Sequence, residues 1–236
     1  MERADFVRHI LERLDVTGWG ISRTGKPDEE FGLRGRDITA ARFGCSITLY
    51  RAYELPREAD PLTGGQYDEG VFDGVLTRER EKGLEQVERL CESLDEVGIS
   101  RWVFPPGQDP DTLVGPFSQK RAAVRAGLGW IGKCTLFVTG KYGPRVKLFT
   151  VLADIEPPAQ APLAPVECGR CSACVDACPY GYLSGAPWDP SAAREDLIDA
   201  FACSLSMERR GEPLGRKHSC GICLLACPLG VGGRGS

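Results

Sequence analysis

The 236-residue sequence lacks any run of 18 apolar residues, the minimum that a helix needs to cross a bilayer. Its first twenty residues also lack an uninterrupted apolar stretch, because acids and bases are scattered through them. A secretory signal would require such a stretch. We therefore expect a cytoplasmic protein with no membrane partner.

Charge of one sign is missing from a long central interval. Residues 112–153 contain no Asp or Glu, yet they hold seven basic residues: Lys120, Arg121, Arg125, Lys133, Lys141, Arg145 and Lys147. Such a run is usually a solvated face, but it also suits an anionic ligand such as a cofactor phosphate. The whole chain has a net charge of −4, which argues against non-specific nucleic-acid binding, so we do not expect nucleic acid as a partner.

Cysteine is scarce in the first 160 residues, where only Cys45, Cys91 and Cys134 occur. We expect Cys45 and Cys91 to be buried core residues. The other eight of the eleven cysteines fall between Cys168 and Cys227. In the reducing cytoplasm, clustered cysteines indicate a metal site rather than disulfides.

Hydrophobic periodicity predicts helices over residues 3–14, 75–97 and 118–127, the last with Ser118 as its N-cap. Strands are predicted over 45–50, 101–105, 134–139 and 145–155, and a loop over 59–74. Residues 157–165 are typical of a linker. The mixed pattern predicts an α+β protein: an α/β cofactor-binding domain over 1–157 and a ferredoxin-like domain over 166–236.

The first cysteine motif comprises Cys168, Cys171, Cys174 and Cys178, followed by Pro179. This is the spacing of a bacterial ferredoxin cluster site, in which three cysteines bind one 4Fe–4S cluster and the fourth binds the other. The second motif contains Cys220, Cys223 and Cys227, one ligand short of a site. Cys203, on a helix predicted over 189–206, supplies the missing ligand.

Eight thiolates then divide into two ligand sets. We predict that one cluster is bound by the Cys227 set: Cys168, Cys171, Cys174 and Cys227. The other is bound by the Cys203 set: Cys178, Cys203, Cys220 and Cys223. Structural zinc is the alternative, although zinc ribbons pair two Cys-x-x-Cys knuckles at wider separation. Electron transfer is the expected role of two clusters, and a purely structural role is the alternative to it.

A glycine-rich segment precedes the cysteine motifs. Gly127, Gly129 and Gly132 fall within six residues, and glycine lets the backbone approach a ligand or adopt positive φ. The segment does not match the dinucleotide-binding fingerprint, because it follows a predicted helix rather than a strand. A tight structural turn and a cofactor loop are both consistent with it.

Residues 122–155, the cysteine motifs and the Cys-Ser-Leu-Ser-Met-Glu sequence at 203–208 together resemble the epoxyqueuosine reductase family, whose superfamily includes the reductive dehalogenases. The resemblance implies a nitroreductase-related N-terminal domain that binds base-off cobalamin, and two clusters that reduce its cobalt. In that family the enzyme then removes an epoxide oxygen from a modified tRNA base. The resemblance also implies which residues line the corrinoid: Gly127, Gly129, Trp130, Gly132 and Lys133.

The chain departs from the family pattern at several positions. Leu113 stands where the family has a catalytic aspartate, and Asp111 lies two residues out of register. Cys134 occupies a position that is usually Asn. Asp111, Lys133 and Cys134 are therefore only weak catalytic candidates. The sequence ends nine residues after Cys227, so we expect a short form without the C-terminal helical-repeat extension, and no tRNA substrate.

Two functional hypotheses follow. The first is an oxidoreductase that takes electrons from a ferredoxin or flavodoxin and passes them to a cofactor in the N-terminal domain. The second is an electron-transfer protein that reduces a partner, for example a corrinoid protein, and has no substrate chemistry of its own.

Overall fold

The computed structural model describes residues 3–25, 43–104, 107–156, 159, 168–214 and 219–230. The chain forms two compact units, each assembled from segments that are distant in sequence. The first unit contains residues 1–51, 80–128 and 147–164, and the second contains 52–79, 129–146 and 165–236. The cysteine-bearing unit thus includes two N-terminal segments that the predicted domain 166–236 does not. The predicted linker 157–165 lies outside the described residues except for Ala159.

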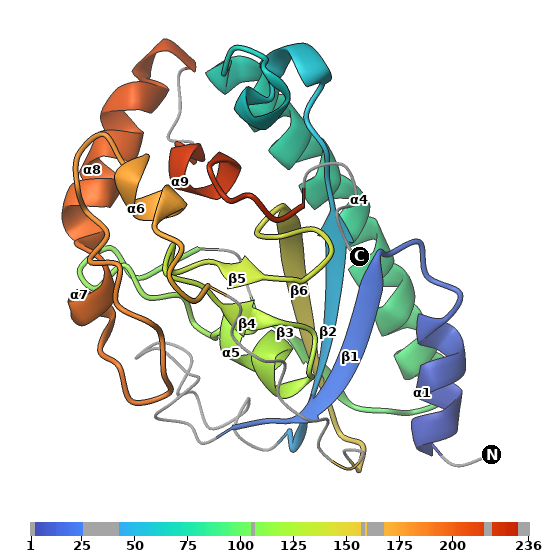
Figure 1. Ribbon diagram of the computed structural model, residues 1–236. Helices are drawn as coiled ribbons and strands as arrows, with labels where there is room; N and C mark the ends of the chain where they lie inside the picture. The colour runs from blue at the N-terminus through green and yellow to red at the C-terminus, as the bar shows by residue number, and fades with distance from the viewer. Residues whose placement is uncertain are drawn as a thin grey trace. The chain divides into compact units, whose positions relative to one another are not determined.

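The first unit is built on a four-stranded sheet of β1 (Gly18–Arg23), β2 (Cys45–Ala52), β6 (Val146–Ala153) and β3 (Arg101–Val103), in that order (Figure 1). β1 pairs antiparallel with β2, and β3 with β6. The strands predicted within 45–50, 101–105 and 145–155 are confirmed. β1 was missed because two glycines weaken its strand signal.

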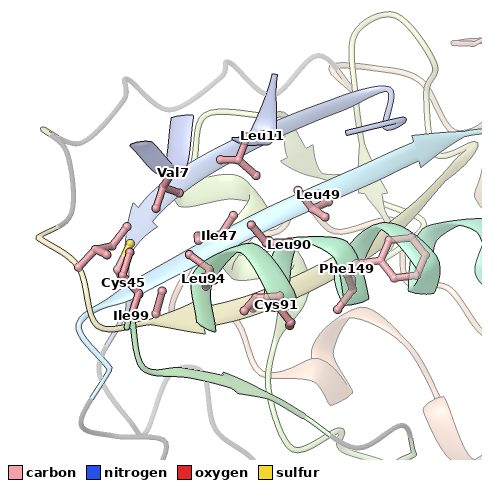
Figure 2. Packing of buried hydrophobic residues seen from close by; sticks show 14 residues of the cluster. Val7, Leu11, Cys45, Ile47, Leu49, Leu90, Cys91, Leu94, Ile99 and Phe149 are labelled. Atoms are coloured by element: carbon pink, nitrogen blue, oxygen red, sulfur yellow. The ribbon is translucent and has the colours of Figure 1, made fainter. Parts of the chain in front are cut away.

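The main core of this unit lies between one face of the sheet and the helices α1 (Arg3–Leu11) and α4 (Glu69–Glu96). Alternate residues of β2, namely Cys45, Ile47 and Leu49, are fully buried in it. Figure 2 shows Leu90 and Leu94 of α4 beside these strand residues. Each buried leucine contributes about 2 kcal/mol to stability. Cys45 and Cys91 are buried in the same cluster, so their predicted core role is confirmed.

Buried hydroxyl groups line the neighbouring positions of the strands. The Oγ atoms of Ser22 and Ser46 lie 2.9 Å apart, and Ser22 also donates to the carbonyl of Ala122 in α5 (Gln119–Arg125). Ser118 caps α5 as predicted, since its hydroxyl accepts the Arg121 N–H at 3.4 Å. Paired hydroxyls thereby satisfy polar groups that would otherwise be costly to bury.

The second unit contains short elements joined by turns. They are η1 (Arg57–Ala59), η2 (Pro61–Thr63), the first residues of α4, β4 (Trp130–Ile131), β5 (Phe137–Val138), α6 (Ala173–Asp176), α7 (Arg194–Leu197), α8 (Ala200–Gly211), η3 (Glu212–Leu214) and α9 (Ile222–Leu225). β4 and β5 form an antiparallel pair. The predicted loop 59–74 is wrong from Glu69 onward, where α4 has already begun. The predicted helix 189–206 is split into α7 and α8, because Ile198 adopts an extended conformation between them.

A buried ion pair braces this unit. Arg145 donates two hydrogen bonds to Asp60, at 2.7 and 3.0 Å, and both side chains are almost fully buried. Asp60 also caps η2 by accepting the Leu62 N–H, and the Arg145 carbonyl accepts the Tyr53 N–H at 3.0 Å. A bidentate pair of this kind fixes geometry as well as charge. Arg145 therefore belongs to the interior of the unit rather than to a solvated basic face.

No helix among the residues described is both long and apolar enough to cross a membrane.

Candidate metal centre

The two cysteine motifs fold in the same way. In each, a four-residue helix contains one cysteine: α6 contains Cys174, and α9 contains Cys223. The Cys-Pro pair of each motif follows the end of its helix. Two residues after each proline is a glycine with positive φ, Gly181 at 67° and Gly230 at 88°. α6 and α9 pack against each other. The local sequence repeat thus becomes a structural repeat.

Aromatic residues hold the second motif. The Tyr67 hydroxyl donates to the carbonyl of Cys220, and its ring meets Phe72 edge to face at 6.0 Å between centroids. Gly221 has a φ of 72°, and a Cβ atom there would lie 2.2 Å from the Phe72 ring. Only glycine satisfies both the backbone conformation and the close approach.

Lys133 holds the first motif. Its ammonium group donates to the carbonyl oxygens of Gly169 at 2.8 Å and Cys171 at 3.1 Å. These two residues follow Cys168 within three positions. Lys133 was a weak catalytic candidate and a predicted corrinoid contact, whereas the structure shows it binding the cysteine loop.

The electrostatics of two thiols indicate which cysteines lie near one another. Burial raises the pKa of Cys227, and the charges of Cys168, Cys174 and Cys171 raise it further. These neighbours are the other three members of the Cys227 set.

Cys223 is surrounded in a similar way by the second set. Burial, followed by the charges of Cys220, Cys203, Cys174 and Cys178, raises the pKa of the Cys223 thiol to about 12. Three of these neighbours complete the Cys203 set, and Cys174 belongs to the other one. Cys174 is thus near both Cys223 and Cys227, and the division into two ligand sets stays a prediction.

Such gathering suits iron–sulfur clusters. The thiolate is the metal-binding form of cysteine, and four thiolates near one another repel until positive charge offsets them. Soft thiolate ligands select iron–sulfur clusters or zinc. Among the described residues, no group of three or more His, Cys, Asp or Glu side chains is close enough to bind a single metal ion. The assignment of individual ligands stays a prediction.

Cys134, one of the weak catalytic candidates, lies near the Cys227 set, since its sulfur and that of Cys168 both lie beside Gly132. Its side chain is 4% exposed and is hydrogen-bonded to Cys174. This hydrogen bond, above the other causes, lowers the pKa of Cys174 to about 7, and with burial it raises the pKa of Cys134.

The glycine-rich segment is packed against the chain's own atoms. A Cβ atom on Gly129 would lie 2.1 Å from the Val138 carbonyl oxygen, and one on Gly132 would meet the sulfurs of Cys168 and Cys134. Trp130 is buried, and its ring nitrogen has no hydrogen-bond partner within the described part of the chain. Gly127 has a φ of 71° just after α5. Packing therefore accounts for Gly129 and Gly132, and contact of the segment with a corrinoid stays a prediction.

The weak catalytic candidate Asp111 lies exposed in a turn of the first unit. This turn is organised by Asp109, whose Oδ1 accepts the N–H groups of Asp111 and Thr112, both at 3.0 Å. Leu113 follows with a φ of 54°, which is uncommon for a residue with a side chain.

The family model that matches the chain is the 4Fe-4S double cluster binding domain, over residues 167–230. This match covers both cysteine motifs and Cys203. The second unit therefore contains a domain that binds two 4Fe–4S clusters.

Curated relatives extend the similarity beyond this domain. Epoxyqueuosine reductase of Pseudomonas aeruginosa is 35% identical over 115 residues, covering 48% of this chain and 32% of the relative. Epoxyqueuosine reductase of Leadbetterella byssophila is 27% identical over 191 residues, covering 81% and 59%. The chain is an epoxyqueuosine reductase-like iron–sulfur protein. It spans between a third and three fifths of the length of these relatives.

Solved structures show that the fold is shared as well. The match with epoxyqueuosine reductase from Streptococcus thermophilus covers 97% of this chain and 66% of the reductase chain, with a TM-score of 0.59 and 19% identity. The match with a catabolic reductive dehalogenase variant covers 94% of this chain and 31% of the dehalogenase chain, with a TM-score of 0.71 and 16% identity. A further reductive dehalogenase is described in connection with B12-dependent dehalogenation. Its match covers 75% of this chain and 25% of the dehalogenase chain, with a TM-score of 0.54 and 15% identity. The predicted fold class is confirmed.

Proposed function

We propose that this epoxyqueuosine reductase-like protein passes single electrons along its two clusters to an acceptor bound by its N-terminal sequence. The observation that carries the proposal is the packing of α6 against α9, because α6 contains Cys174 and α9 contains Cys223. These two residues belong to different ligand sets. Two clusters bound by them would be close together, as an electron path requires.

The short helices account for this proximity. Cys174 lies in α6 and Cys178 just after it, and the two belong to different sets. Cys223 and Cys227 repeat the arrangement at α9. Each helix therefore connects both clusters, as the fourth cysteine does in two-cluster ferredoxins. When bound, the clusters supply one-electron transfer, at potentials between roughly −700 and +450 mV.

The acceptor that we propose is a corrinoid. The likeness in fold to a reductive dehalogenase described in connection with B12 supports this proposal, as does the similarity to epoxyqueuosine reductases. Gly127, Gly129, Trp130, Gly132 and Lys133 remain the residues proposed to bind it. We propose a ferredoxin or flavodoxin as the electron donor and the cytoplasm as the location, where cluster thiolates stay reduced. The net charge of −4 keeps nucleic acid outside the proposal.

A specific observation favours the second hypothesis, an electron-transfer protein that reduces a partner. Leu113 places an apolar side chain where the family has its catalytic aspartate, and the nearest acid, Asp111, is exposed to solvent in a turn. An apolar side chain supplies no proton for general-acid chemistry. The carrier hypothesis needs no such proton.

Titration with cob(II)alamin separates the two. Protein carrying both clusters, prepared anaerobically and checked for iron and sulfide, is titrated while the EPR spectrum of the cobalt is followed. A change to the base-off spectrum at micromolar protein supports the hypothesis of a corrinoid-dependent oxidoreductase. The control is Cys91→Ala, which alters only the core of the first unit and should behave like the wild type. A cobalt spectrum that stays unchanged at high micromolar corrinoid contradicts corrinoid binding and favours the carrier.

A further inference from the structure

The two cysteine motifs repeat each other in sequence and local fold, but different side chains hold the loops at which they begin. In the second motif, the neutral Tyr67 hydroxyl donates to the carbonyl of Cys220. In the first motif, the ammonium group of Lys133 donates to the carbonyls of Gly169 and Cys171, at 2.8 and 3.1 Å. The repeat is therefore broken by one positive charge.

The charge of Lys133 has no ion-pair partner among the described residues. Both of its hydrogen bonds go to uncharged carbonyl groups. Residues 112–153, which include β4 and β5, contain no Asp or Glu. On α6, the carboxylate of Asp176 accepts the hydroxyl of Ser172 at 2.6 Å instead. The positive charge therefore acts on whatever the first cysteine loop binds.

A fixed positive charge favours the reduced form of a cluster. Reduction adds one electron, so the cluster and its thiolates become more negative by one charge. Attraction to a nearby cation stabilises this reduced state more than the oxidised state, and charge is among the factors that determine cluster potentials. Lys133 should therefore raise the potential of the cluster that it adjoins. The uncharged Tyr67 hydroxyl gives the other cluster no such stabilisation.

The cysteine loop held by Lys133 also lies beside the glycine-rich segment. A Cβ atom on Gly132 would lie 3.3 Å from the sulfur of Cys168. Cys168 is a member of the Cys227 set, and Gly132 belongs to the segment proposed to bind the acceptor. An electron on the cluster of the Cys227 set is therefore held beside that segment.

We propose that the charge of Lys133 raises the reduction potential of the cluster of the Cys227 set above that of the Cys203 set. Single electrons supplied by the donor then pass from the Cys203 set to the Cys227 set, and so toward the glycine-rich segment. This direction of transfer rests on the proposed function. The difference in potential does not, because it is measured without any acceptor.

An EPR-monitored redox titration of the full chain, without corrinoid, tests this proposal. Iron content first verifies that each variant carries both clusters, and the signal lost in Cys227→Ser identifies the cluster of the Cys227 set. In the wild type this cluster should have the higher midpoint potential. Lys133→Gln can keep a hydrogen bond but not the charge. The equilibrium constant for reducing this cluster should then fall about tenfold, or about 59 mV for one electron.

Two further variants separate charge from hydrogen bonding. Lys133→Arg keeps the charge, so its potentials should stay near those of the wild type. Tyr67→Phe removes the corresponding hydrogen bond from the second motif without changing any charge, and should shift neither potential as far as Lys133→Gln does. If Lys133→Gln does not retain both clusters, Lys133→Met takes its place in the comparison.

The order of the two potentials in the wild type depends on no substitution of Lys133. A cluster of the Cys227 set without the higher potential would overturn the proposal. Equal shifts in Lys133→Gln and Lys133→Arg, or an equal effect of Tyr67→Phe, would also overturn it. Zinc in place of iron would instead contradict the proposed function itself, so the two failures are distinguishable.

Discussion

The ammonium group of Lys133 lies 2.8 Å from the carbonyl oxygen of Gly169. It joins the end of the glycine-rich segment to the loop that begins the first cysteine motif, 36 residues later in the chain. The second bond, to the Cys171 carbonyl, fixes the same loop at another point. The conformation of the Cys227 set therefore depends on a residue outside the cysteine-rich sequence.

Removing this clamp should make one cluster labile. A hydrogen bond to a charged donor contributes about 1.5–3 kcal/mol, and less where water reaches it. We expect Lys133→Met to lose visible cluster absorbance in air several-fold faster than wild type. Lys120→Met, which removes a lysine from α5 in the first unit, serves as the control. Equal bleaching rates for the two variants would show that the clamp does not protect the cluster.

Breaking the buried ion pair should destabilise the second unit strongly. Arg145→Met leaves the Asp60 carboxylate buried without its bidentate partner, and such an uncompensated charge costs about 3–5 kcal/mol. We expect anaerobic urea denaturation to report a loss of this size. The double variant Arg145→Met with Asp60→Asn should recover part of it, because no buried charge then remains. A loss below about 1 kcal/mol would mean that the pair is not buried as described.

Two glycines allow steric contact to be separated from backbone strain. Gly221 and Gly169 both have positive φ, at 72° and 43°, but a Cβ atom on Gly221 would meet Phe72 whereas one on Gly169 would meet nothing within 4 Å. Positive φ costs a residue with a side chain about 1–2 kcal/mol. Gly169→Ala should lose about this amount in urea denaturation, and Gly221→Ala distinctly more. The opposite order would contradict the packing of Phe72 against the second motif.

The core thiol of Cys45 predicts a dependence of stability on alkaline pH. Burial raises the pKa of Cys45 from 9.0 to about 12, so the folded state keeps the proton that the unfolded state loses. Its contribution to stability is complete below pH 9 and disappears as the pH rises toward 12. Between these values the unfolding free energy of wild type should fall more steeply than that of Cys45→Val, which has no titrating group there. Parallel curves would refute the buried thiol.

Much of the metal centre could be predicted from sequence because cluster ligands follow a local spacing. The Cys-x-x-Cys-x-x-x-Cys-Pro repeats at 171–179 and 220–228 form similar short helices. Cys203 could be added because eight ligands are needed. The fold also followed local patterns wherever apolar residues alternated strictly, as in β2.

The remaining features depend on contacts between distant residues. Nothing near Arg145 in sequence indicates that Asp60 neutralises it, so its charge suggested a solvated face or an anion site. Likewise, the partner of Lys133 is a backbone carbonyl, which has no sequence signature. The glycines at 129 and 132 suggested a cofactor loop because Val138 and Cys168, which occupy the adjacent space, become neighbours only on folding.

The central claim is that two clusters are held by the Cys227 set and the Cys203 set. Its most direct test is the iron content and EPR spectrum of anaerobically purified wild type, Cys203→Ser and Cys227→Ser. We predict about eight irons in the wild type, about four in each variant, and the loss of a different cluster signal in each. Stoichiometric zinc in place of iron, or loss of the same signal in both variants, would contradict the account.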